Sequence, residues 1–285
     1  MHKIRKAIIP VAGLGTRFLP ITKDVPKEML PIVDIPTIEY IVKEAVDSGI
    51  EEILFVTNPY KNSIENYFDH HYELEERLKK NNKNEQLEKV LKPTCMASFM
   101  FLRQGEPLGT GHAIKICKNF INGEPFAVLY GDDIIDSSVP CLKQMINMYE
   151  KYDCNVLCAL ELSDKEIPSK GIIEYEDNNE LKIKRLVEKP KLEEAPSKYG
   201  TIGRYILKPE IFDELDKIEL KNGEYLLTDA FERLIKYQSF YACKLDGKYY
   251  DIGNQFGYLK CNIEFSLKRE DIEKSLKEYL KNIEL

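Results

Sequence analysis

The sequence lacks a long apolar run, paired cysteines and an excess of positive charge. No stretch of about 18 apolar residues is present, so we expect no membrane-spanning helix and no membrane partner. The seven cysteines form no C-x-x-C pair. Their odd number favours a reducing compartment over a disulfide framework, which predicts a cytoplasmic protein with free thiols. The formal charge of −7 argues against nucleic acid as a partner, because such binding depends on clustered lysine and arginine. The four histidines lack the spacing of zinc ligands.

The composition is that of an ordinary globular chain, with 43% hydrophobic and 31% charged residues. A length of 285 residues fits one large α/β domain with an added lobe. We expect a single catalytic domain over 1–265, in which the sequence pattern changes near residue 160 from alternating strand and helix segments to mainly strand segments. This change divides it into a first part at about 1–160 and a second part at about 161–253. C-terminal helices are expected over 254–285.

Short apolar runs alternate with helix-like segments in the first half, and this rhythm predicts a mainly parallel mixed sheet flanked by helices. Strands are expected at 7–11, 53–57, 99–102, 126–130 and 155–160. The second half predicts a smaller β-rich lobe, with strands at 171–175, 183–187 and 201–207. Segments 240–245 and 249–251 are expected to return to the main sheet.

Helices are predicted where apolar residues recur at helical spacing. Residues 38, 41, 42, 45 and 46 form one such stripe, with Thr37 as its expected N-cap. The remaining expected helices are 62–68, 72–91, 111–120, 140–152, 209–217, 228–237, 255–267 and 270–283.

The first apolar strand leads directly into a loop with two glycines and a cation, Gly13-Leu14-Gly15-Thr16-Arg17. Glycines let backbone N–H groups approach a phosphate, and Arg17 can bind phosphate oxygens in a bidentate manner. A dinucleotide fingerprint needs a third glycine where Phe18 stands. A P-loop needs G-x-x-x-x-G-K-[ST], which is absent from the sequence. The loop alone therefore leaves two alternatives, a phosphate site or a structural βα turn.

A second motif follows closely, Pro26-Lys27-Glu28-Met29-Leu30-Pro31. With these two motifs the sequence resembles the bacterial UTP–glucose-1-phosphate uridylyltransferases. The resemblance extends in order to about residue 265. Its later segments are Arg103-Gln104-Gly105, Gly109 to Ala113, Gly131-Asp132-Asp133, Val187 to Pro190, Ile202 to Tyr205, Leu227 to Ala230 and Asp251 to Asn254. It implies a Rossmann-like nucleotidyltransferase fold, with nucleotide binding in the first part of the domain and sugar binding in the second.

Site residues follow partly from the residues and partly from this resemblance. Asp132 and Asp133 come just after an apolar strand, where carboxylates can hold a hard cation. Gln104 offers the donor and the acceptor that a base edge requires. The resemblance implies catalytic roles for Arg17, Lys27, Asp132 and Lys189. It implies nucleotide binding by Ala12, Gly13, Leu14, Gly15, Thr16, Gln104 and Gly109. It implies sugar binding by Gly171, Glu188, Lys189 and Gly203, and Mg²⁺ as cofactor on Asp132 and Asp251.

The implied reaction joins UTP and glucose 1-phosphate to give UDP-glucose and pyrophosphate, by in-line attack on the α-phosphorus. Three departures from the family pattern leave the sugar open. Leu108 replaces a lysine, Lys170 a tyrosine and Leu227 a glutamine. The alternatives are uridylyl or thymidylyl transfer to another sugar 1-phosphate, such as N-acetylglucosamine 1-phosphate, and a catalytically silent sugar-nucleotide sensor.

The C-terminal helices carry apolar stripes at Ile263, Leu267, Ile272, Leu276 and Leu280. Two interpretations stay open: these stripes contact another subunit, or they pack on the core of their own chain. We expect a homo-oligomer, a dimer or a tetramer.

Overall fold

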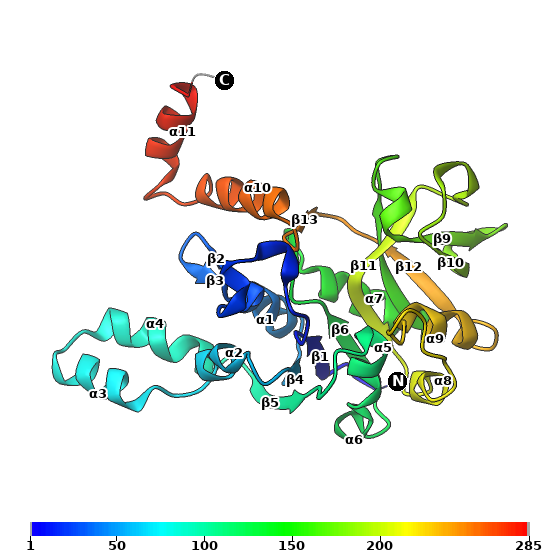
Figure 1. The fold of residues 1–285 in the computed structure, drawn as a ribbon, viewed down its shortest axis with the longest axis horizontal. Coiled ribbons are helices and arrows are strands. Elements are labelled where there is room, and N and C mark those ends of the chain that lie inside the picture. The colour runs from blue at the N-terminus through cyan, green and yellow to red at the C-terminus, as the bar shows by residue number, and fades with distance from the viewer. Residues whose placement is uncertain (1, 284–285) are drawn as a thin grey trace.

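The computed structural model describes residues 2–283 and contains a nine-stranded mixed sheet in the order β5-β4-β1-β6-β11-β8-β12-β10-β9 (Figure 1). The first four of these strands are parallel, and so are β8 and β12. Strand β11 runs antiparallel to both of its neighbours. The predicted mixed α/β sheet is confirmed, with its parallel pairing concentrated in the first half of the chain. The strand bounds are β1 Lys6–Pro10, β4 Glu52–Thr57, β5 Ser98–Arg103, β6 Phe126–Leu129, β8 Asn155–Glu161, β9 Gly171–Glu176, β10 Asn179–Glu188, β11 Tyr199–Leu207 and β12 Phe240–Lys244.

The sheet separates two apolar cores, one on each face. Strand β1 shows the principle, because Ile8 and Ile9 are both fully buried and belong to opposite cores. Such a continuous apolar run is typical of a parallel strand that is covered on both faces. Helices α1 (Thr37–Asp47) and α7 (Cys141–Tyr152) cover the face of Ile9. Helices α5 (Gly109–Lys115), α6 (Lys118–Ile121), α8 (Ile211–Leu215) and α9 (Leu227–Leu234) cover the face of Ile8.

Two short sheets lie outside the main sheet. Strand β13 (Lys248–Asp251) pairs with β7 (Asp133–Asp136), so the expectation that 249–251 returns to the main sheet is wrong. The sequence pattern does not predict β7, because this four-residue strand begins within the polar Gly131-Asp132-Asp133 segment. Strands β2 (Pro31–Ile32) and β3 (Ile35–Pro36) form the other pair.

Three predictions about helices are also corrected. The segment expected as one helix over 111–120 is divided between α5 and α6. The segment expected as one helix over 72–91 is two helices, α3 (Tyr72–Lys80) and α4 (Asn84–Thr94), and Asn82 between them has a φ of 55°. Thr37 is the first residue of α1 rather than its N-cap, and its hydroxyl donates a hydrogen bond to the carbonyl of Leu30 at 2.8 Å. Pro36 holds the capping position and offers no side-chain hydrogen bond.

The C-terminal helices α10 (Gln255–Ser266) and α11 (Glu273–Lys281) lead away from the sheet, and α11 projects from the body of the protein (Figure 1). Helices α3 and α4 project from another side.

Across residues 2–283 no helix has the length and apolar character that a membrane crossing requires. The remaining elements are α2 (Asn62–Tyr67) and five short 3₁₀ turns: Thr16–Phe18, Ile21–Lys23, Lys27–Met29, Ile167–Ser169 and Leu192–Glu194.

Candidate active site

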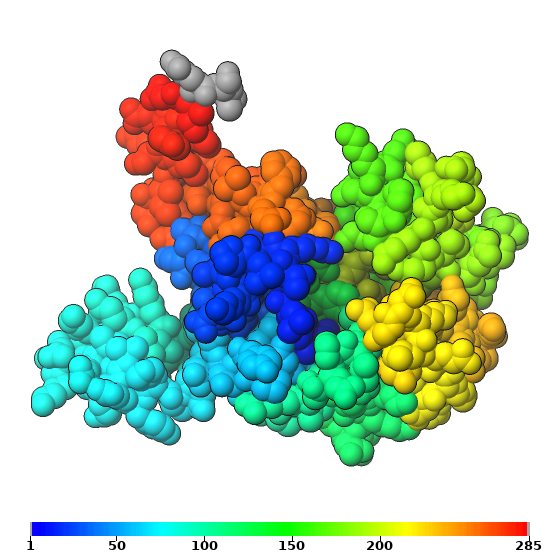
Figure 2. All heavy atoms as spheres, viewed as in Figure 1, coloured from blue at the N-terminus to red at the C-terminus, as the bar shows by residue number. Residues whose placement is uncertain are grey.

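The parallel strands place several predicted residues at one edge of the sheet. The segments that follow β1, β4, β5 and β6 begin near Ala12, Asn58, Gln104 and Asp132. Because these four strands are parallel, their carboxyl ends meet at the same edge, where open α/β sheets bind ligands. Asn58 ties two segments together by donating from its amide nitrogen to the carbonyl of Ala12 at 2.7 Å. The surface is hollowed between the blue N-terminal segment and the yellow-green smaller lobe (Figure 2).

The glycine loop takes a shape that requires one of its two glycines. Gly15 has a φ of 66°, in the left-handed region, and the chain then enters the turn Thr16–Phe18. The hydroxyl of Thr22 donates to the carbonyl of Gly15 at 2.8 Å and fixes this bend. A Cβ added at Gly13 would meet nothing within 4 Å, so open space adjoins the backbone there. The loop therefore offers accessible backbone beside Arg17.

Arg17, Asp132 and Asp251 converge on Gly253. A Cβ built on Gly253 would lie 2.8 Å from Asp132 Oδ2, 3.0 Å from Asp251 Oδ1 and 3.5 Å from Arg17 Nη1. Asp251 Oδ1 also accepts the Gly253 N–H at 2.9 Å. Three residues that are far apart in the sequence thus surround one point, and glycine leaves that point open.

Lys27 completes this cluster by forming an ion pair with Asp132, with Nζ 2.5 Å from Oδ2. Burial is the largest single influence and works against the charged form of Lys27, but the carboxylates of Asp132, Glu28 and Asp133 together outweigh it and raise the pKa of Lys27. Burial likewise opposes ionisation of Asp132, whereas Lys27, with a smaller contribution from Lys170, lowers the pKa of this carboxyl overall. Asp132 is therefore charged near neutral pH and suited to hold a cation.

Asp133 has a different environment from its neighbour. Its Oδ2 accepts the backbone N–H of Gly203 at 2.8 Å, and its Oδ1 accepts the hydroxyl of Tyr249 at 2.6 Å. Burial and the adjacent Asp132 raise the pKa of Asp133. Asp133 thus holds the segment Gly131-Asp132-Asp133, here called the acidic turn, in place, while Asp132 faces Arg17 and Lys27. A Cβ on Gly203 would lie 2.4 Å from Asp133 Oδ2, so the structure places this glycine against the acidic turn.

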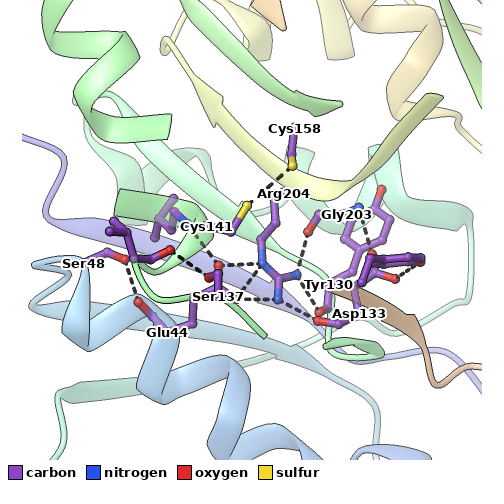
Figure 3. Close-up of polar contacts among 12 residues, drawn as sticks. Glu44, Ser48, Tyr130, Asp133, Ser137, Cys141, Cys158, Gly203 and Arg204 are labelled. Atoms are coloured by element: carbon purple, nitrogen blue, oxygen red, sulfur yellow. Dashed lines mark hydrogen bonds and ion pairs between the residues drawn. The ribbon is translucent and has the colours of Figure 1, made fainter. Parts of the chain in front are cut away.

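A buried arginine supports the same turn from behind. The guanidinium of Arg204 binds both carboxylate oxygens of Glu44 and donates to the carbonyls of Tyr130, Asp133 and Gly203 (Figure 3). The Arg204 side chain is fully buried, and that of Glu44 is 9% exposed. No local sequence pattern predicts this pair, because the two residues are 160 positions apart. The one sequence feature that singles out Arg204 is the family motif Ile202-Gly203-Arg204-Tyr205.

A second buried ion pair lies beside the acidic turn, with Lys61 Nζ 2.7 Å from Glu28 Oε2. Glu28 is 1% exposed, and its side chain packs against Gly131, where an added Cβ would come within 3.1 Å of Glu28 Cγ. Burial lowers the pKa of Lys61, and the neighbouring carboxylate only partly offsets this. Glu28 belongs to the second motif, and the structure gives it a supporting position under the acidic turn.

Gln104 is buried, and its amide is held in one orientation. Its Nε2 donates to the carbonyl of Gly109 at 3.2 Å and to His112 Nδ1 at 2.9 Å. Burial, together with the positive charge of Lys115, lowers the pKa of His112, which keeps the ring neutral and able to accept. Among residues 2–283 no side-chain or backbone donor reaches Gln104 Oε1, which leaves this oxygen for a ligand donor. Gly109 itself packs against Tyr225, whose carbonyl lies 3.0 Å from the position of an added Cβ.

The predicted sugar residues divide between two places. Gly171, Glu188 and Lys189 lie together at the paired ends of β9 and β10, whereas Gly203 lies in β11 against the acidic turn. Gly171 pairs with Glu188 in the register, and a Cβ on Gly171 would lie 3.2 Å from Glu188 Oε2. Lys189 has a φ of 46° and places its ammonium 3.6 Å from Glu188 Oε1. Its side chain is 62% exposed. Glu188 thus lies over a gap that glycine creates, beside an exposed cation.

This geometry defines a class of protein: an α/β enzyme with a glycine loop, converging cations and two carboxylates for a phosphate-containing substrate. The chain belongs to the nucleotidyl transferase family, whose family model matches residues 6–266.

Within that family it belongs with the bacterial UTP–glucose-1-phosphate uridylyltransferases, as the resemblance predicted. It is 45% identical to UTP–glucose-1-phosphate uridylyltransferase 1 of Staphylococcus saprophyticus over 284 residues, covering 99% of both chains. The structure of a UTP-bound UGPase from Acinetobacter baumannii superposes with a TM-score of 0.91 at 35% identity, over 99% of this chain and 100% of that one. A UDP-glucose pyrophosphorylase complexed with UDP-glucose superposes with a TM-score of 0.85 at 40% identity, over 93% and 100% of the two chains.

Proposed function

We propose that the protein transfers a uridylyl group from UTP to glucose 1-phosphate, forming UDP-glucose and pyrophosphate. The observation that carries this proposal is the convergence of Arg17, Lys27, Asp132 and Asp251 beside the glycine loop. Full-length relatives named for this reaction, and similar structures bound to UTP and to UDP-glucose, support the same substrates. In the division expected from the sequence, the loop and Gln104 belong to the first part and Glu188 to the second, which supports separate sites for nucleotide and sugar.

UTP would bind along the carboxyl edge of the parallel strands. The segment Ala12 to Thr16 would place its backbone N–H groups on the triphosphate, with Arg17 beside them. Gln104 Oε1 would accept the N3–H of uracil, because the amide nitrogen is already held by Gly109 and His112. A base that presents an acceptor at this position would leave Gln104 Oε1 unpaired, which discriminates against it.

Glucose 1-phosphate would bind across from the nucleotide. Glu188 would accept hydrogen bonds from glucose hydroxyls over the gap at Gly171, and Lys189 would meet the phosphate. A nonbridging phosphate oxygen then attacks the α-phosphorus of UTP, and a new P–O bond forms as the bond to the β-phosphate breaks. Pyrophosphate leaves with that electron pair. The phosphate nucleophile is already ionised, so no general base is needed.

The residues fit Mg²⁺ as the metal. Mg²⁺ in such sites is held by one or two carboxylates together with substrate phosphate oxygens, and Asp132 and Asp251 lie on one side of Gly253. In residues 2–283 no group of three or more protein ligands is gathered for a metal, so substrate oxygens would complete the coordination. When bound, Mg²⁺ would neutralise phosphate charge. Arg17 and Lys27 would stabilise the charge that develops in the transition state.

The test measures pyrophosphate release with a matrix of nucleoside triphosphates against sugar 1-phosphates, for the wild type and two variants. UTP with glucose 1-phosphate should give the highest rate. Asp132→Asn should lower turnover by about 10²-fold or more, the size of effect seen when one preorganised charge contact is removed. Asp164→Asn is the matched control, because Asp164 is 61% exposed and forms its ion pair with Lys198 on the surface.

Two results would count against the proposal separately. A higher rate with thymidine triphosphate or N-acetylglucosamine 1-phosphate would overturn the specificity and keep the reaction class. If Asp132→Asn turned over as fast as Asp164→Asn, Asp132 would not be the metal ligand.

We also propose that the protein acts in the cytoplasm as a homo-oligomer. All seven cysteines are free thiols, which suits a reducing compartment. Helix α10 leaves Phe256 and Leu259 exposed by 77% and 55%, and α11 projects away from the core of its own chain (Figure 1). These features favour subunit contacts over internal packing as the role of the C-terminal helices. Light scattering on the purified protein measures the subunit number.

A further inference from the structure

Lys170 is a cation at the active site that the family pattern does not assign, since that pattern expects a tyrosine here. It immediately precedes Gly171, and its backbone carbonyl accepts the N–H of Lys189 at 3.1 Å. Gly171 in turn pairs with Glu188. Lys170 therefore stands directly beside the residues proposed to bind the sugar.

The side chain of Lys170 points from the sugar residues toward the acidic turn. Its Nζ donates to the hydroxyl of Tyr249 at 3.2 Å and lies 5.3 Å from the centre of that ring. Tyr249 donates in turn to Asp133 Oδ1 at 2.6 Å. A short chain of contacts thus joins the Lys170 ammonium to the turn that carries Asp132.

Lys189, the cation that the motif assigns, points elsewhere. Its ammonium lies 3.6 Å from Glu188 Oε1, and its side chain is 62% exposed. Lys27 is already paired with Asp132 at 2.5 Å on the nucleotide side. Lys170 lies between Glu188 and the acidic turn, and its ammonium points toward that turn through Tyr249.

The charge of the substrate calls for a cation at this position. Glucose 1-phosphate brings a phosphate anion, and its reacting oxygen must come close to a turn with two adjacent carboxyl groups. Without a cation between Glu188 and Asp132, this approach would bring like charges together. An ammonium that hydrogen-bonds a phosphate oxygen offsets the repulsion and fixes the position of that oxygen.

We propose that Lys170 binds the phosphate of glucose 1-phosphate and is a catalytic residue of this chain, an inference that rests on the proposed function. In the ligand-free structure Tyr249 supplies the acceptor for its ammonium. A phosphate oxygen replaces or joins this acceptor when the sugar phosphate binds. Lys170 should affect the binding of glucose 1-phosphate rather than that of UTP, because its side chain extends toward the acidic turn from the residues proposed to bind the sugar.

The experiment compares the full-length wild type with Lys170→Met, Lys170→Arg and the control Lys198→Met. Lys198 is 64% exposed and pairs with Asp164, on the same lobe. Pyrophosphate release is measured while each substrate is varied at saturation of the other. A charge-assisted hydrogen bond corresponds to about 10- to 100-fold in affinity. We expect Lys170→Met to raise the KM for glucose 1-phosphate by about that factor, with less than about a twofold change in the KM for UTP. Lys170→Arg should recover most of the loss, and Lys198→Met should match the wild type.

The outcomes separate this inference from the proposed function. If the wild type released no pyrophosphate from UTP and glucose 1-phosphate, the proposed function would be wrong. Lys170 would still be tested by calorimetric titration of glucose 1-phosphate, in which equal binding by Lys170→Met and Lys198→Met overturns the inference. If the wild type is active, a Lys170→Met enzyme with both KM values equal to those of Lys198→Met overturns it. So does an equal rise in both KM values, which would indicate a structural role through Tyr249.

Discussion

Replacement of Arg204 by methionine tests whether the buried ion pair behind the acidic turn sets the stability of the fold. Arg204 is the largest fully buried side chain, and its guanidinium donates hydrogen bonds to Glu44 and to three backbone carbonyls (Figure 3). Methionine keeps a similar length and flexibility, so the change removes the charge and the donors and leaves most of the packing in place.

The expected loss is about 3–5 kcal/mol in the free energy of unfolding. That is the usual cost when one partner of a buried pair is removed, because the other charge stays buried without compensation. Here the carboxylate of Glu44, 9% exposed, would lose its three contacts to the guanidinium and keep only the weaker support of the Leu142 backbone N–H. A loss of this size is a large share of the roughly 5–15 kcal/mol that stabilises a typical domain.

Urea unfolding followed by circular dichroism measures the effect, and the slope with denaturant should stay unchanged. Arg185→Met is the matched control, since Arg185 is 63% exposed and pairs with Glu174 at 2.5 Å on the surface. That control should cost no more than about 1 kcal/mol. The double variant Glu44→Met/Arg204→Met should be more stable than Arg204→Met, because it leaves no unpaired charge. If Arg204→Met and Arg185→Met lost the same stability, the reasoning about the buried pair would be refuted.

Two further predictions concern the acidic turn and a carboxylate remote from it. Gly203→Ala should cost about 1–3 kcal/mol by overpacking and should lower turnover, because the new Cβ would lie 2.4 Å from Asp133 Oδ2 and from Tyr130 Cβ. Gly105→Ala, with nothing within 4 Å, should unfold like the wild type, and equal stability of the two variants would contradict the clash. Glu214, 3% exposed, has its pKa lowered to about 2, mainly by the hydrogen bond from Lys217. A lowered pKa contributes stability above the unfolded value of about 4.3, and this is lost as the pH falls toward 2. The difference in unfolding free energy between the wild type and Glu214→Gln should therefore shrink over that range, and a difference independent of pH would exclude the effect.

The sequence alone determined the order of the elements and the chemistry gathered at the sheet edge. Apolar runs such as 7–11 and 126–130 predicted strands correctly, because a strand buried on both faces needs a continuous apolar segment. The glycines and cations of the first two motifs indicated a phosphate site. These signals are local, so neighbouring residues suffice to read them.

Only the tertiary structure decided which of these groups face one another. Three contacts show this: the pairing of β7 with β13, the contact of Arg204 with Glu44 and the contact of Lys170 with Tyr249. Each joins residues between 79 and 160 positions apart. No local periodicity records such contacts, because they depend on how the sheet and the smaller lobe pack. The same packing gave Asp132 and Asp133 opposite pKa shifts, although they are identical neighbours in the sequence. Burial opposes the charge of both, but Lys27 pairs with Asp132, whereas the charge of Asp132 adds to the effect of burial on Asp133.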